Sequence, residues 1–303
     1  MSPAALPYIL GLGLMFGTTL IISRFSLGQF EASTYIWLRL AISSLVFAAS
    51  YAIMSRRNGV KRGWPVDRGL WRDGVILGIF GTAVPMVGYV SSLNYQSAGV
   101  TALLLTIAPA VTVLMAQFLL PDEQLTRRKV AGIALALAGA ALLVLRGESG
   151  LAGIAGSPIG YGLVLGAISI DSYMLIYTRK YCRTYNTFDL SNVRTLVAAL
   201  VVAPLSLLLV GFDLSAVTIS GYAALIYAVA FGTFGGLILF LYTTQRFGAT
   251  AASLTSYVLP VVAAVGGVLF LDETITTVML VGMALIIAGI AILNRREPVP
   301  IEV

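Results

Sequence analysis

Asp171 is the residue of this sequence best suited to chemistry, because it is the only carboxylate well inside a long apolar segment. Exposing an ionised aspartate to lipid costs at least about 2.5–3.5 kcal/mol, so its side chain should face a bundle interior, a cavity or a partner. There it could pair with the ammonium of a cationic or zwitterionic solute, or it could exchange protons. The alternative is a structural aspartate that an arginine or a neighbouring helix holds.

Four tyrosines are candidates for contact with the same solute, since a tyrosine offers a ring face for a cation and a hydroxyl for a hydrogen bond. Tyr89 and Tyr257 fall on apolar segments, Tyr242 lies near the end of another, and Tyr173 follows Asp171 by two residues. The competing interpretation is an aromatic belt at the membrane interface, or packing between helices. We expect Tyr89 and Tyr257 to line a cavity and include Tyr173 and Tyr242 as further binding candidates.

Arg39 and Arg194 also lie inside apolar segments. A guanidinium can bind a carboxylate through two parallel hydrogen bonds, so Arg39 is a candidate for a solute carboxylate. The two arginines occupy equivalent places in an internal repeat, which favours a scaffolding role near each membrane face. Both interpretations stay open on the sequence alone.

Pro109 and Pro260 are candidate hinges, because each interrupts an apolar segment and each recurs in the repeat. They could shape a cavity or permit a rocking motion, and the alternative is a pair of ordinary tolerated kinks. Small residues recur as well, and they predict close helix packing. These are Gly132, Gly139, Gly282 and Gly289.

The composition excludes most classes of protein. Of 303 residues, 58% are hydrophobic and 11% are charged, whereas a soluble domain has about 25% charged residues. A single cysteine, Cys182, and no histidine exclude a disulfide framework, a Cys/His metal site and a histidine-based triad. No nucleotide-binding motif is present. We therefore expect an integral membrane protein that is not an enzyme, binds no nucleic acid and needs no cofactor or metal.

Apolar segments of about 20 residues predict an all-α integral membrane fold with ten transmembrane helices. The predicted spans are 5–23, 32–54, 74–93, 98–119, 128–145, 159–179, 189–210, 221–242, 250–270 and 278–294.

The lysines and arginines predict the orientation. With the N-terminus inside, 15 of them lie on the cytoplasmic side, two lie outside and two lie within spans. We expect both termini in the cytoplasm and the protein in the cytoplasmic (inner) membrane, with the net charge of +6 reflecting topology rather than an acidic partner.

An internal repeat divides the chain at residues 1–150 and 151–303. Asp122-Glu123 recurs as Asp272-Glu273 at an offset of 150 residues, and Arg24…Arg39 recurs as Arg179…Arg194. We expect each acidic pair to cap the helix that follows it. Five helices per repeat give the two halves opposite orientations, which is the architecture of secondary transporters that rock one half against the other.

The pattern Pro109…Asp122-Glu123…Gly132…Gly139 and its repetition resemble the drug/metabolite transporter superfamily, specifically EamA-type exporters with ten helices. The resemblance covers nearly the whole chain. It implies export of small metabolites, often amino acids, by a functional monomer. The cavity would be lined by the third, fourth, eighth and ninth helices and by the inner ends of the first, second, sixth and seventh. The fifth and tenth helices would pack at the periphery.

We therefore predict a secondary transporter that exports small metabolites (amino acids or related amines) by alternating access, with protons as a possible coupling ion. The alternative is proton-coupled efflux of hydrophobic cations, which would also require Asp171. The first helix has a local likeness to small multidrug resistance proteins, but Leu14 stands where that family has its glutamate.

Overall fold

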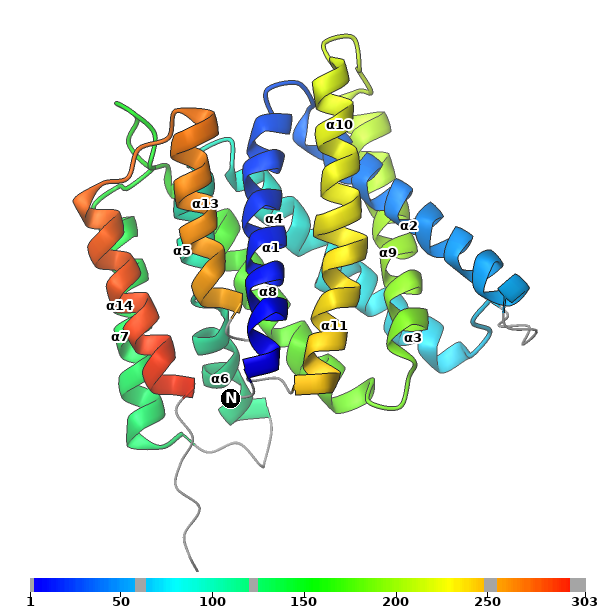
Figure 1. Cartoon of the computed structure of the whole chain (residues 1–303), viewed down its shortest axis with the longest axis horizontal. Coiled ribbons are helices and arrows are strands. Elements are labelled where there is room, and N and C mark those ends of the chain that lie inside the picture. The colour runs from blue at the N-terminus through cyan, green and yellow to red at the C-terminus, as the bar shows by residue number, and fades with distance from the viewer. Residues whose placement is uncertain (1–2, 58–63, 120–124, 248–254, 295–303) are drawn as a thin grey trace, which may run out of the picture.

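The computed structural model describes residues 3–57, 64–119, 125–247 and 255–294 (Figure 1). Within these ranges the regular structure is helical, apart from one isolated bridge between Leu151 and Ile154. The prediction of an all-α fold is confirmed. The helices in chain order are η1 (Pro3–Ala5), α1 (Leu6–Ser26), α2 (Ala32–Arg57), α3 (Arg68–Gly78), η2 (Ile79–Ala83), α4 (Val84–Ser92), α5 (Ala98–Leu105), α6 (Ala108–Leu119), α7 (Arg127–Leu145), α8 (Pro158–Tyr181), α9 (Thr187–Pro204), η3 (Leu205–Val210), α10 (Ile219–Tyr227), η4 (Ala228–Gly235), α11 (Gly236–Phe247), α13 (Thr255–Leu271) and α14 (Thr277–Asn294).

Nine helical segments of the described chain are long and apolar enough to cross a membrane. The tenth, α13, has 17 residues, at the lower end of the range of roughly 17–25 that a span requires. These ten segments match the ten predicted spans. Residues 250–254, where we expected the ninth span to begin, lie outside the described residues.

The third span begins at Arg68 rather than at the predicted residue 74. The start of α3 carries three charged residues, Arg68, Arg72 and Asp73, so hydropathy alone places the boundary too late. Asp67 ends the preceding loop and accepts a hydrogen bond from the backbone N–H of Gly69 at 2.9 Å, as expected of an N-cap. The extension brings Asp73 into the span.

Pro109 and Pro260 have different effects on their helices. The fourth span is divided at Thr106 and Ile107 into α5 and α6, and Pro109 lies in the first turn of α6, where its missing N–H is tolerated. Pro260 lies inside α13, which continues past it. The hinge role of both residues stays a prediction.

Three spans contain a π-helical segment, namely η2, η3 and η4. Pro85 follows η2 and Pro204 precedes η3, whereas η4 contains Gly232 and Gly235. A π-helical turn changes the direction of side chains and carbonyls, and such turns are frequent at functional sites. Two of these segments, η2 and η4, contribute to the cavity described below.

The recurring glycines join the two halves of the chain at one end of the molecule, where α7 and α14 lie side by side (Figure 1). A Cβ on Gly132 would lie 2.7 Å from the carbonyl oxygen of Gly289, and one on Gly139 would lie 2.8 Å from that of Gly282. The small residues therefore allow the two helix backbones to touch, as the pattern predicted.

The acidic pair of the second repeat does not cap the helix that follows it, and this expectation was wrong. The N-terminus of α14 is capped by Thr276, which accepts from the backbone N–H of Met279 at 3.1 Å. The buried carboxylate of Glu273 instead accepts from the N–H groups of Ala98 and Gly99, at 2.8 and 3.4 Å. The second repeat therefore caps α5 of the first. Asp122 and Glu123 lie outside the described residues.

Glu273→Gln is expected to lower the free energy of unfolding by about 1–2 kcal/mol, because the amide keeps one acceptor but loses the charge that favours a helix N-terminus. The melting temperature in detergent measures this effect. Glu31→Gln, which changes an exposed acid, is the matched control. Equal melting temperatures for Glu273→Gln and the wild type would contradict the role of Glu273.

Candidate functional site

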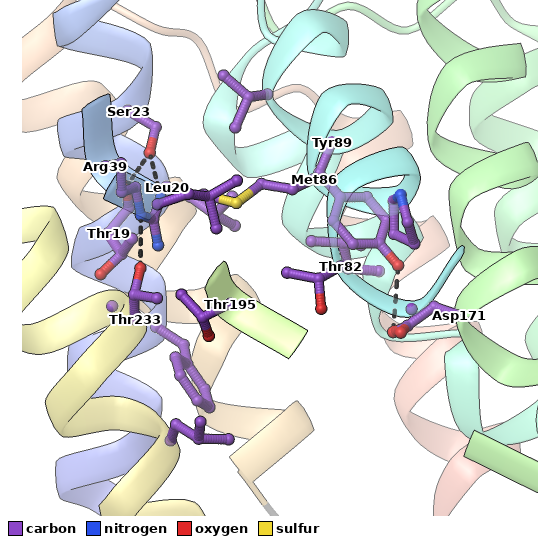
Figure 2. A pocket seen from close by; sticks show the side chains of 18 of the residues that line it. Thr19, Leu20, Ser23, Arg39, Thr82, Met86, Tyr89, Asp171, Thr195 and Thr233 are labelled. Atoms are coloured by element: carbon purple, nitrogen blue, oxygen red, sulfur yellow. Dashed lines mark hydrogen bonds between the residues drawn. The ribbon is translucent and has the colours of Figure 1, made fainter. Parts of the chain in front are cut away.

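A cavity of about 490 Å³ lies where the two halves of the chain meet (Figure 2). Within the described residues, every span except those of α7 and α14 contributes to its wall, in agreement with the expected peripheral place of α7 and α14. Its apolar wall is formed by Phe16, Leu20, Leu40, Pro85, Met86, Val90, Leu105, Ala108, Leu237, Phe240 and Leu259. Its polar wall is formed by Thr19, Ser23, Arg39, Thr82, Tyr89, Asp171, Arg194, Thr195 and Thr233, with Gly81 and Gly232 beside them.

Asp171 lies in the wall of this cavity, on α8, and faces Tyr89 on α4 (Figure 2). The hydroxyl of Tyr89 donates a hydrogen bond to Oδ2 of Asp171 at 3.3 Å. Among the described residues, no lysine or arginine nitrogen lies within 4.0 Å of this carboxylate. An acid in this position can accept a cationic group from a solute or a proton.

Arg39 lies on the opposite side of the cavity in Figure 2 and is 8% exposed. Its Nε donates to Oγ1 of Thr233 at 2.8 Å, and its Nη1 donates to the hydroxyl of Ser23 at 3.3 Å. Both partners are neutral hydroxyls, and Thr233 belongs to the other repeat. Arg39 therefore lines the cavity and bonds across the boundary between the halves.

Arg194 makes the corresponding contacts in the opposite direction. Its Nε donates to Oγ1 of Thr82 at 2.9 Å, and its Nη2 donates to the carbonyl oxygen of Gly81 at 2.7 Å. The Nε of each arginine thus donates to a threonine in a π-helical segment of the other repeat, Thr233 of η4 or Thr82 of η2, and Arg194 also bonds to Gly81. The expectation that the arginines are equivalent agrees with these contacts, and the expectation of a place near each membrane face stays a prediction.

The sequence carries a further signal for these contacts, which the predicted site does not include. Phe80-Gly81-Thr82 recurs as Phe231-Gly232-Thr233, at nearly the same offset as the other repeated features. A Cβ on Gly232 would lie 2.6 Å from Nη2 of Arg39, so this glycine leaves room for the guanidinium. Comparing the two halves position by position would identify this motif and the two arginines as features that recur together.

Three of the candidate tyrosines do not line this cavity. Tyr257 packs against the buried cluster around α5 and α7, and its hydroxyl accepts from Asn294 at 3.4 Å. Tyr173 is 47% exposed, because two residues along a helix turn the side chain about 200° away from Asp171. Tyr242 is exposed and packs on the ring of Tyr8, with 5.4 Å between centroids. Only Tyr89 of the four lies at the cavity.

Asp73 is a fully buried acid near the start of α3, which the predicted start of the third span at residue 74 leaves outside the membrane. It accepts hydrogen bonds from Tyr177 and Tyr185, both at 3.1 Å, and from Nε of Arg72 at 2.9 Å. With both carboxylate oxygens bonded and an ion pair present, Asp73 ties α3 to α8 and to the loop before α9. No group of three metal-ligating side chains occurs in the described part of the chain.

Cys182 lies beside this cluster, between α8 and α9, and is buried. Burial, and next the negative charge of Asp73, raise the pKa of Cys182 to about 11, from a usual 9.0. Because the thiolate is the reactive form, we expect the native protein to react with maleimide at pH 7.5 at least about 100-fold more slowly than free cysteine.

Mass spectrometry of timed samples measures this rate, and the same reaction in dodecyl sulfate is the control for access. Complete labelling of the native protein within the first minutes would contradict the burial of Cys182.

Comparison with known proteins identifies the family. The EamA-like transporter family matches this chain twice, over residues 4–145 and 158–295. An uncharacterized transporter from Archaeoglobus fulgidus is 26% identical over 268 residues, which cover 86% of this chain and 87% of the relative. A probable terminal-alkyne amino-acid exporter from Streptantibioticus cattleyicolor is 28% identical over 219 residues, which cover 71% of each protein.

A solved crystal structure shares the fold, with a TM-score of 0.64 at 23% identity over 96% of each chain. The described helices, the cavity between the halves and the double family match lead to one conclusion. This chain is a multi-pass membrane transporter that belongs to the EamA-like transporter family.

Proposed function

We propose that this protein exports small amphipathic metabolites, with amino acids or related amines as the substrate class, across the cytoplasmic membrane by alternating access. The observation that carries this proposal is the cavity itself, where the half-buried acid Asp171 stands in a mostly apolar wall. Such a wall suits a solute with a small charged group and an apolar body. The name of the relative from Streptantibioticus cattleyicolor, an amino-acid exporter, gives independent support.

The two halves of the chain, 1–150 and 151–303, would be the bodies that move. Arg39 and Arg194 each bond across the boundary between them, so a change in their relative position must change both contacts. The distribution of lysine and arginine supports cytoplasmic termini, which would place the loop with Cys182 inside the cell.

Asp171 would have one of two roles, and an imposed pH gradient separates them. If it binds the ammonium of the solute, transport follows the solute gradient alone. If it exchanges protons, a pH gradient drives accumulation of the solute. We assign the first role to it, because the Tyr89 hydroxyl bond and the absence of a cation within 4.0 Å in the described residues leave a carboxylate oxygen for the solute.

The test is transport into sealed proteoliposomes that contain the purified full-length protein. Radiolabelled amino acids, nucleosides and organic cations are compared, each with and without a pH gradient, against protein-free vesicles. Uptake of amino acids or small amines is the expected result. Uptake of bulky organic cations alone would overturn it in favour of cation efflux, and uptake of nucleosides alone would overturn the substrate class.

A further inference from the structure

We infer that Arg39 binds a carboxylate of the transported solute, so that the substrates are amino acids with an apolar side chain rather than amines that lack a carboxylate. This inference rests on the proposed function and narrows it. Three features of the cavity support it, namely the charge of Arg39, its pseudo-equivalent in the other repeat and the groups around it.

Arg39 is a buried cation that lacks an acidic partner among the described residues. It is 8% exposed, and no Asp or Glu oxygen in the ranges that the structure covers lies within 4.0 Å of its guanidinium. Its hydrogen bonds go to the hydroxyls of Thr233 and Ser23. A buried charge is costly unless it is paired, so a site of this kind favours a ligand that brings the opposite charge.

The second repeat contains the acid that the first repeat lacks. Arg194 and Asp171 both line the cavity, so the arginine of the second repeat shares it with an acid. At the repeat offset of 155 residues that relates Arg39 to Arg194, the position of Asp171 corresponds to Phe16, which also lines the cavity. With Arg39, Arg194 and Asp171, the cavity has one more positive than negative charge. A solute carboxylate would bring the opposite charge to Arg39, while the ammonium of the same solute would pair with Asp171 as proposed above.

The surroundings of Arg39 suit the rest of an amino acid. Thr19 donates its own hydroxyl proton to the backbone carbonyl of Met15 at 2.6 Å, which leaves its oxygen to accept a hydrogen bond from the solute. The apolar side chains of Leu20, Met86 and Leu237 line the same cavity. An aliphatic or aromatic side chain of the solute would therefore contact them while its carboxylate stays at Arg39.

A matched series of solutes tests the inference: phenylalanine, phenethylamine, which lacks the carboxylate, and 3-phenylpropionate, which lacks the ammonium. Binding of each radiolabelled compound to the full-length protein in nanodiscs avoids leakage through vesicles. We expect phenylalanine to bind wild type at least about 10-fold more tightly than phenethylamine, since a hydrogen bond to a charged group contributes about 1.5–3 kcal/mol. We also expect measurable binding of 3-phenylpropionate.

Arg39→Gln should weaken binding of phenylalanine and 3-phenylpropionate by about 10- to 100-fold and leave phenethylamine nearly unchanged. Arg39→Lys should bind phenylalanine and 3-phenylpropionate with an affinity between those of wild type and Arg39→Gln, because lysine keeps the charge but not the planar fork. Equal weakening of all three solutes would assign Arg39 to structure alone and overturn the inference. If Arg39→Gln does not fold, the wild-type series and Arg39→Lys still test whether Arg39 binds the carboxylate.

The two proposals fail in different ways. Wild-type binding of phenethylamine as tight as that of phenylalanine overturns the role of Arg39 but leaves the proposed export of amines. Proteoliposomes that move neither amino acids nor amines overturn the proposed function, and the inference with it.

Discussion

Asp171→Asn is expected to lower transport of an amino acid or amine in proteoliposomes by at least about 10-fold. The substitution keeps the size of the side chain and its hydrogen bond with Tyr89, but it removes the charge that a solute ammonium or a coupled proton requires. Loss of one charge-assisted hydrogen bond in a site of low polarity alone accounts for a change of this size. The initial rate of uptake, normalised to the amount of protein inserted, is the measurement.

Two control variants separate this effect from damage to the fold. Asp213→Asn changes an exposed acid in the loop between η3 and α10, and it should transport like wild type. Tyr89→Phe removes only the hydroxyl that donates to Asp171, so we expect a smaller loss than for Asp171→Asn. An Asp171→Asn protein with the wild-type rate would show that Asp171 is structural, and recognition would then depend on the other groups of the cavity.

The largest effect on stability is expected for Gly289→Leu. A Cβ on Gly289 would lie 2.5 Å from the backbone nitrogen of Ala136 and 2.6 Å from the carbonyl oxygen of Gly132. Backbone atoms of a packed helix cannot rotate away, so α7 and α14 must separate along this seam. We expect a loss of about 3 kcal/mol in the free energy of unfolding, at the upper end of the effects of overpacking.

Unfolding in detergent, followed by circular dichroism, measures the change. Gly162→Leu is the matched control, because Gly162 is exposed on α8 and a Cβ there meets nothing within 4 Å. Equal destabilisation by the two variants would show that the extra side chain, rather than the close approach of α7 and α14, is responsible.

Hydropathy was sufficient to predict the ten spans, because the bilayer imposes one length on every helix that crosses it. The same reasoning placed Asp171 correctly at an internal cavity, since lipid exposure of its charge is too costly. Hydropathy placed the start of α3 too late. The charged residues at this end of the helix are stabilised by the Asp67 cap and by the bonds of Asp73 with Tyr177, Tyr185 and Arg72, rather than by lipid.

The candidate site was predicted only in part, because residue type does not specify the direction of a side chain. Tyr89 and Tyr173 are the same residue type on neighbouring helices, and only helical rotation separates the one in the cavity from the one at the surface. The partners of Arg39 and Glu273 lie 194 and 175 residues away in the sequence. No local pattern indicates contacts at such separations.

The cap that Glu273 provides for α5 has a consequence for the order of events during biosynthesis. At about 5–20 residues per second, Glu273 leaves the ribosome about 9–35 s after Ala98. During that interval the first N–H groups of α5 lack their final acceptor, although the helix is already made. The N-terminus of α5 therefore reaches its final state only when the chain is nearly complete, and a truncated first half would lack this acceptor permanently.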